Sequence, residues 1–228
     1  MVSVRGRANT LHSQLSAAGI DRSEDGHYTY LGNTLSIDLS EYMLACIDRG
    51  DSEAIIKFIK RLYENPSHDT RTRLFEFMDR NKMPIDNSGR FLAFKVVNSD
   101  YTDKHTRTID NHPGITVPRM DWSEVDTDPT VTCSRGYHAC SIDYLDFFFG
   151  HDDRVVSVAI GPEDVGAIPD DYDGAKLRCR QYHVVKDITE QYKRDYQKTK
   201  LHINSGDGIE INRDDTITTF FGFRRDFY

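Results

Sequence analysis

The chain has 228 residues, 38% of them hydrophobic and 29% charged, which suits a folded protein with a real core and excludes an intrinsically disordered one. Its formal net charge of −8 disfavours nucleic acid as a partner, because that affinity comes mostly from Lys and Arg at phosphates. No run approaches the length of a transmembrane helix, and the start MVSVRGRANT lacks the apolar stretch of a signal peptide. We therefore expect a reducing cytoplasm, in which the four cysteines are free thiols.

The N-terminal part of the sequence predicts an arm followed by a β-hairpin. Residues 1–26 mix polar residues with one brief apolar stretch, and we expect a mobile arm or a loosely attached short helix. In the run YTYLGNTLSI, a two-residue turn at Gly32 and Asn33 would join two strands and place Tyr30 opposite Leu35.

Three helices are predicted next, because apolar residues recur there at helical spacing. The first begins at Asp38, which forms a plausible capping box with Glu41, and it should bury Cys46. Proline limits the second and third helices at their C-terminal ends. The predicted helices cover residues 38–49, 52–65 and 67–83.

After residue 84 the pattern changes from helical spacing to alternation, which is typical of strands. A helix inserted after Ser141 would bury Ile142, Leu145 and Phe149. The fold class is thus α+β: an N-terminal hairpin and three-helix segment, then a mostly antiparallel β domain with one or two inserted helices. The predicted strands are 91–97, 114–117, 154–160 and 181–188, and the predicted divisions are 1–26, 27–84, 85–200 and 201–228.

The C-terminal tail ends in an aromatic and arginine cluster. Such a composition is favoured at protein interfaces, although a terminal strand docked on its own sheet is the simpler interpretation. The candidate partner-binding residues are Phe221, Phe223, Arg224, Arg225 and Tyr228.

The stretch TCSRGYHACS (132–141) concentrates reactive side chains and has three interpretations: a metal site, a catalytic cysteine or a structural corner. Cys133, His138 and Cys140 are weak candidates for metal ligands, because structural zinc sites usually carry cysteines two to four residues apart and these are seven apart. Arg135 lies near enough to lower the pKa of the Cys133 thiol, which is what a nucleophile requires. A tight structural corner is the third interpretation, with a turn at residue 136 and residues 137 and 139 packed inward.

The loop 98–114 also collects polar side chains that suit a ligand or acid–base site. Carboxylate beside imidazole is the material of general acid–base catalysis, but Asp and Asn also dominate turns because they bond the local backbone. The candidates are Asp103, His105, Asp110 and Asn111. Phosphate-loop, nucleophile-elbow and HExxH motifs are absent from the sequence.

Several blocks of the sequence resemble, in order and spacing, the C-terminal two-thirds of the rIIB family of T-even bacteriophages. The blocks are ENPS (64–67), LFEFMD (74–79), FLAFKVV (91–97), IDNHPG (109–114), TCSRGYHACS (132–141) and IPDDYDGAKLRCRQYHVVKDITEQYK (168–193). The resemblance implies a phage protein of the infected bacterial cytoplasm, loosely associated with the inner membrane. It also implies a role in lysis timing and prophage exclusion, an rIIA-like partner and no agreed enzymatic activity. Longer members carry a segment resembling a helix-turn-helix before the shared region, where this sequence has about 26 residues.

The segment RGYHACSIDYLDFFF is similar to the G-Y-x-A segment of ADP-ribosyltransferase-type folds. This second resemblance implies an NAD-gripping His105 or Arg107 and a catalytic Glu190, with Arg135 and His138 available to a ligand. A shared fold without activity is the simpler expectation, because folds host many functions.

The leading hypothesis is therefore a non-enzymatic phage accessory protein, without cofactor or metal, that binds host or phage proteins. The alternatives are an ADP-ribosyltransferase-like protein acting on NAD or a related nucleotide, and a nucleic-acid-binding regulator. The oligomeric state is left open.

Overall fold

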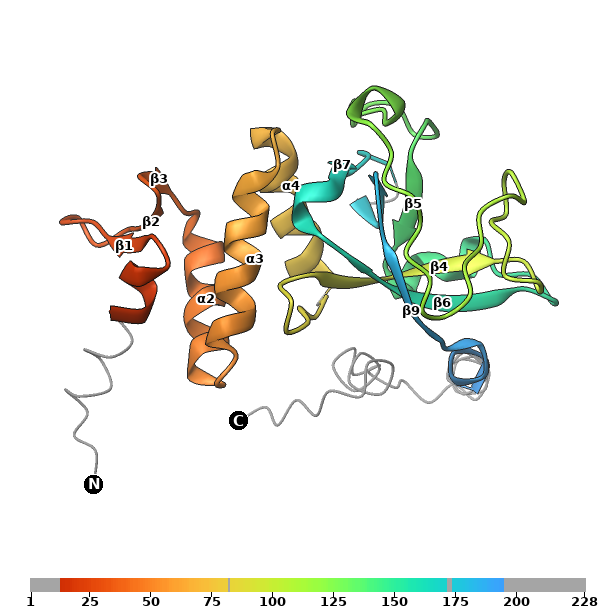
Figure 1. Ribbon diagram of the computed structural model, residues 1–228, viewed down its shortest axis with the longest axis horizontal. Helices are drawn as coiled ribbons and strands as arrows, with labels where there is room; N and C mark the ends of the chain where they lie inside the picture. Colours follow the sequence, from red (N-terminus) through yellow and green to blue (C-terminus); the bar gives the residue numbers. More distant parts are fainter. Residues whose placement is uncertain (1–12, 82, 172–173, 195–228) are drawn as a thin grey trace, which may run out of the picture.

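The computed structural model describes residues 13–81, 83–171 and 174–194 (Figure 1). A small three-stranded sheet, a layer of three helices and a six-stranded sheet follow one another along the molecule, and the helices lie between the two sheets (Figure 1). The fold is α+β, as predicted, with antiparallel pairing throughout both sheets.

The small sheet consists of β1 (Ile20–Arg22), β2 (Tyr28–Tyr30) and β3 (Asn33–Thr34). The predicted register was wrong, because Tyr30 pairs with Asn33 and the turn residues are Leu31 and Gly32. Both turn residues have positive φ, 47° and 81°, as the type I′ hairpin turn requires. Part of the predicted arm is also structured, since Ile20 is fully buried and its strand pairs with β2.

The three predicted helices are confirmed as α2 (Ile37–Asp48), α3 (Ser52–Glu64) and α4 (His68–Arg80). The cap of α2 differs from the prediction, because the Ser36 hydroxyl, and not Asp38, accepts the Leu39 N–H at 3.2 Å. Cys46 is buried as expected. Ser67 caps α4 by accepting the Thr70 N–H.

The large sheet has the strand order β7-β8-β5-β4-β6-β9, so the predicted antiparallel domain is present. Three short 3₁₀ helices lie in its connections. The strands are β4 (Phe91–Val97), β5 (Tyr137–Cys140), β6 (Arg154–Ile160), β7 (Val165–Ala167), β8 (Lys176–Cys179) and β9 (His183–Asp187), and the 3₁₀ helices are η1 (Trp122–Glu124), η2 (Ile142–Phe147) and η3 (Pro162–Asp164).

Two elements predicted for this region differ from those in the structure. Residues 114–117 form no strand, and only Thr116 makes a single β-bridge, to His183. Flanking prolines at 113 and 118 lack the N–H that a ladder needs, and Gly114 has φ +92°. The inserted helix after Ser141 is the six-residue η2, a 3₁₀ helix, although it does bury Leu145 as predicted.

The two faces of the large sheet are covered by different hydrophobic clusters. One face shares a continuous core with the helices and the small sheet, which extends from Leu15 to Val184. The opposite face carries a second cluster, to which η2 and the chain after β9 contribute. Its buried residues are Phe94, Val96, Cys140, Tyr144, Leu145, Val155, Ile188 and Tyr192.

Candidate functional site

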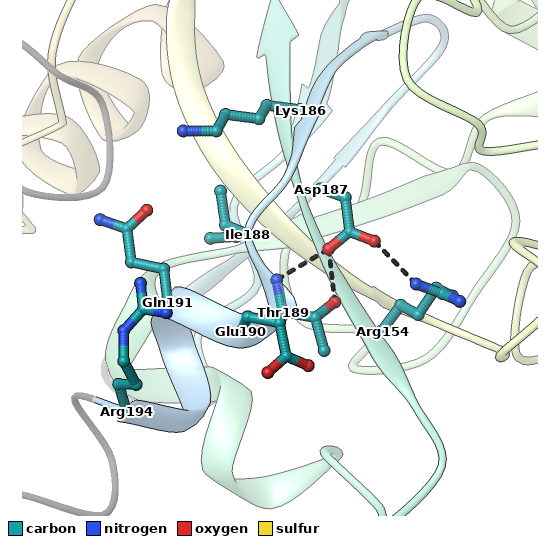
Figure 2. A pocket seen from close by; sticks show the side chains of 8 residues that line it. All are labelled: Arg154, Lys186, Asp187, Ile188, Thr189, Glu190, Gln191 and Arg194. Carbon is teal, nitrogen blue, oxygen red and sulfur yellow. Dashed lines mark hydrogen bonds and ion pairs between the residues drawn. The ribbon is translucent and has the colours of Figure 1, made fainter.

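A surface hollow of about 300 Å³ lies where β9 ends and the chain turns into a helical segment at residues 189–194 (Figure 2). Lys186, Gln191 and Arg194 lie on one side of Ile188, and Asp187 faces Arg154 on the other (Figure 2). The lining residues are Arg154, Lys186, Asp187, Ile188, Thr189, Glu190, Gln191 and Arg194.

Asp187 is the polar centre of this junction. Its carboxylate accepts the Thr189 N–H at 2.8 Å, the Tyr101 hydroxyl at 2.6 Å and a guanidinium N–H of Arg154 at 3.0 Å. Burial raises the pKa of Asp187, but the hydrogen bond from the Thr189 hydroxyl at 2.6 Å and the bonds named above outweigh burial and hold the pKa below its ordinary value. Asp187 is thus an ionised structural group that fixes the end of β9.

Tyr101 attaches the loop 98–112 to the edge of the hollow. The Arg154 guanidinium lies 4.5 Å from the centre of the Tyr101 ring, and the His112 ring stacks at 4.3 Å. Arg154 also donates to the Ser99 carbonyl at 2.7 Å. Together these contacts hold the loop against β6 and β9.

The charges of the hollow favour an anionic group over a cation. Two arginines and a lysine line it, against the two carboxylates of Asp187 and Glu190. Asp187 already pairs with Arg154, and Glu190 lies 3.8 Å from the Lys193 ammonium. The arrangement can bind a carboxylate or phosphate, and the buried Thr189 hydroxyl within it donates to Asp187 at 2.6 Å.

Within the loop, Asp103 and Asn111 serve the fold. The buried Asp103 carboxylate accepts five hydrogen bonds at 2.6–3.1 Å from residues 105–109. Burial raises the pKa of Asp103, yet the bonds from Ile109, Thr106 and their neighbours lower it far more. The Asn111 amide donates to the Tyr101 and Ile109 carbonyls, and its oxygen accepts the Tyr182 hydroxyl.

The remaining loop candidates lie on the surface. His105 is exposed, and so is Asp110, whose carboxylate is 2.6 Å from Nδ1 of His112. Hydrogen bonds from the His112 backbone and ring lower the pKa of Asp110. The carboxylate–imidazole pair of this loop is therefore Asp110 with His112, and His105 takes no part in it. Arg107, the other candidate for gripping NAD, is an exposed residue with φ +58°.

The stretch 132–141 forms the predicted corner. Gly136 has φ +128°, and the side chains of Tyr137 and Ala139 are buried. His138 packs where burial lowers its pKa to about 4, and its Nε2 lies 2.9 Å from the Ser134 carbonyl oxygen. Arg135 is exposed.

The cysteines give no metal centre in the described part of the chain. All four are free thiols, and Cys133 is exposed whereas Cys140 is buried with its pKa raised to about 12 by that burial. Among the described residues, no group of three or more His, Cys, Asp or Glu side chains is arranged to hold a metal ion.

Of the other candidates, Glu190 lines the hollow, and the five tail residues lie outside the described part of the chain. Arg154, Lys186 and Arg194 were not identified as site residues from the sequence. The sequence pattern of a strand does not show which distant segment its end contacts. Two exposed aromatics, Phe147 and Phe148, were also missed, since the predicted helix was assigned an apolar stripe that includes only Phe149 of the run FFF. No helix in the described ranges is long and apolar enough to cross a membrane.

These features define the class of the protein: an α+β protein built on an antiparallel sheet, with a polar surface hollow and a loop held by two buried polar side chains. A family model described as "Bacteriophage T4 protein rIIB" matches residues 25–193. Protein rIIB of Enterobacteria phage T4 is 42% identical over 177 residues, which cover 77% of this chain and 56% of the T4 protein. The chain belongs to the rIIB family, and it spans little more than half the length of this curated relative. No solved structure matches it.

Proposed function

We propose that this chain is a phage accessory protein that acts in the cytoplasm of the infected bacterium by binding proteins, and not by catalysis. One observation carries the proposal: three of the side chains that suggest chemistry in the sequence are held within the fold. Asp103 is saturated by loop hydrogen bonds, His138 is held neutral by burial, and the Cys140 thiol is buried. A catalytic group must reach a substrate, and these three groups face the interior.

The partner is proposed to be a host or phage protein, with an rIIA-like protein as the first candidate. Membership of the rIIB family supports this choice, and lysis timing or prophage exclusion is the proposed process. The tail residues Phe221, Phe223, Arg224, Arg225 and Tyr228 are proposed as one contact region, on the strength of their composition.

Affinity capture from infected cells tests the proposal. The tagged full chain is expressed during infection, and captured proteins are quantified against uninfected cells and against a tagged phage protein of similar size. We expect at least one host or phage protein to be enriched in proportion to the bait. Failure to enrich any protein above both controls, with the bait folded and abundant, would refute a protein-binding role.

A second candidate function is binding of NAD or a related nucleotide in an ADP-ribosyltransferase-like manner. It is favoured by one observation, that Glu190 and Arg154 line the same hollow together with Lys186 and Arg194. Calorimetry with NAD and with ADP-ribose tests it, using Lys186→Ala/Arg194→Ala as the variant that should abolish the heat. Absence of heat with the unaltered chain at millimolar nucleotide eliminates this candidate.

A further inference from the structure

The most exposed aromatic residues of the described chain form a pair on the face of the sheet opposite the helices. Phe147 is 68% exposed and Phe148 is 55% exposed. Burying a phenylalanine side chain is worth about 1.5–3 kcal/mol, so two exposed neighbours leave a large stabilisation unused. Together they offer roughly 250 Å² of ring surface, which is about a third of one side of a standard protein interface.

The pair stands on a rigid base. The buried Tyr144 ring lies beneath both phenylalanines, with ring centres 5.5 Å from Phe147 and 5.1 Å from Phe148. The Phe148 N–H donates to the carbonyl of Leu145, which is fully buried. A side chain held in this way loses little conformational freedom on binding, which is the property of an interface anchor.

The surroundings of the pair are acidic. Between Gly136 and Asp153 the sequence has four aspartates and no lysine or arginine. Asp153 is buried and paired with Lys104 at 2.7 Å, but Asp143, Asp146 and Asp152 are exposed. Asp146 accepts the Tyr192 hydroxyl, and Asp152 lies 2.9 Å from Nδ1 of His151.

Two lysines from elsewhere approach the base of this surface. Lys176 lies 6.0 Å from the centre of the Tyr144 ring and pairs with Asp171 at 2.6 Å. Lys193 lies 5.9 Å from the centre of the Phe149 ring and 3.8 Å from Glu190. Each lysine also lies close to a carboxylate, Lys176 to Asp171 and Lys193 to Glu190.

We propose that Phe147 and Phe148, with Asp143, Asp146 and Asp152 around them, dock a protein segment that carries apolar side chains flanked by lysine or arginine. Aromatic anchors with an oppositely charged rim are the usual composition of a specific interface. A membrane is a poorer match, because bacterial inner-membrane lipids are anionic and would face three carboxylates. A second copy joined through the same surface would bring these carboxylates against one another. This inference rests on the proposed protein-binding function and assigns it a surface.

Site-specific photocrosslinking tests the assignment. The full chain with Phe148→p-benzoylphenylalanine is expressed in infected cells and irradiated, and the crosslinked peptide is identified by mass spectrometry. Ile37→p-benzoylphenylalanine, at another exposed apolar residue, is the matched control. We expect residue 148 to crosslink to a partner segment with basic and apolar residues, and residue 37 not to crosslink to it.

Variants then measure what the surface contributes to binding. A synthetic peptide of the crosslinked segment should bind Phe147→Ala/Phe148→Ala at least ten-fold more weakly than the unaltered chain, and Asp152→Lys several-fold more weakly, while Ile37→Ala binds normally. Circular dichroism and thermal melting should be unchanged, because the replaced side chains are exposed.

Three outcomes overturn the assignment. In the first, residue 148 crosslinks only to residues 195–228 of the same chain, and in the second it crosslinks only to a second copy of the chain or to lipid. The third outcome is that Phe147→Ala/Phe148→Ala captures the partner as well as the unaltered chain does. In the last case the protein-binding function survives and its surface lies elsewhere. If the unaltered chain captures no partner at all, the proposed function itself fails.

Discussion

Replacing Asp103 with alanine should weaken the fold through the loop 98–112. The carboxylate accepts four backbone N–H groups and the Thr106 hydroxyl at 2.6–3.1 Å, and it is only 8% exposed. Hydrogen bonds to a charged group contribute about 1.5–3 kcal/mol each, but they are not additive. Residues 105, 106 and 108 are exposed, so water can replace part of what is lost. We therefore expect the free energy of unfolding to fall by about 2–3 kcal/mol.

Urea denaturation followed by tryptophan fluorescence measures this loss, because Trp122 is the single tryptophan and packs beside the Arg180 guanidinium. Asp100→Ala is the matched control in the same loop. Its carboxylate accepts the Thr102 N–H and hydroxyl at the exposed surface, so its removal should lower the free energy of unfolding much less than removal of Asp103. Equal losses from the two variants, or no loss from Asp103→Ala, would show that the loop is held by other contacts.

The same variant has a pH signature. The folded-state pKa of Asp103 lies below its unfolded value, so its contribution is complete above an unfolded pKa of about 3.9 and disappears as the pH falls through the folded value. The stability difference between the unaltered chain and Asp103→Ala should therefore be largest near neutral pH and shrink below about pH 4. A difference that grows on acidification contradicts the assignment.

Three further predictions concern single buried groups. The His138 imidazole should titrate with a pKa of about 4 by NMR, and its lowered pKa should reduce stability as the pH falls below its ordinary 6.5. Of the four thiols, only Cys133 should react rapidly with a thiol reagent in the folded chain, because burial raises the pKa of both Cys140 and Cys179 to about 12. Asn65→Ala should lower the free energy of unfolding by about 2–4 kcal/mol in a denaturant titration, since its buried amide donates to two carbonyls at 2.8 and 2.9 Å.

The helices and the longest strands were predictable because their signals are local. The stripes of α2, α3 and α4 repeat over three turns or more, and Ser67 and Pro66 limit two of the helices. β4 and β6 are seven-residue strands of mostly apolar residues with both faces covered, which makes them recognisable without knowledge of their partners.

The short strands were not predictable, because their stability comes from distant partners. β8 contains Lys176 and Arg178, both buried, in a stretch that resembles a surface segment. Arg178 donates to the carbonyls of Val131 and Asp128, about 50 residues earlier, and that pairing leaves no local pattern. The hollow was missed for the same reason, since Arg154, Asp187 and Tyr101 come from three separate segments.

The distribution of polar and apolar groups supports the proposed protein-binding role. Asp103 and Asn111 are buried, and their side chains hydrogen-bond backbone groups of the loop 98–112. Phe147 and Phe148 point outward from a rigid base, although burial would stabilise both. A catalytic site needs reactive groups that reach a substrate, whereas a binding surface needs ordered apolar groups in water. Within the described chain, Phe147 and Phe148 are ordered apolar groups in water. Replacing both with alanine should therefore weaken the proposed partner binding and leave the stability of the fold unchanged.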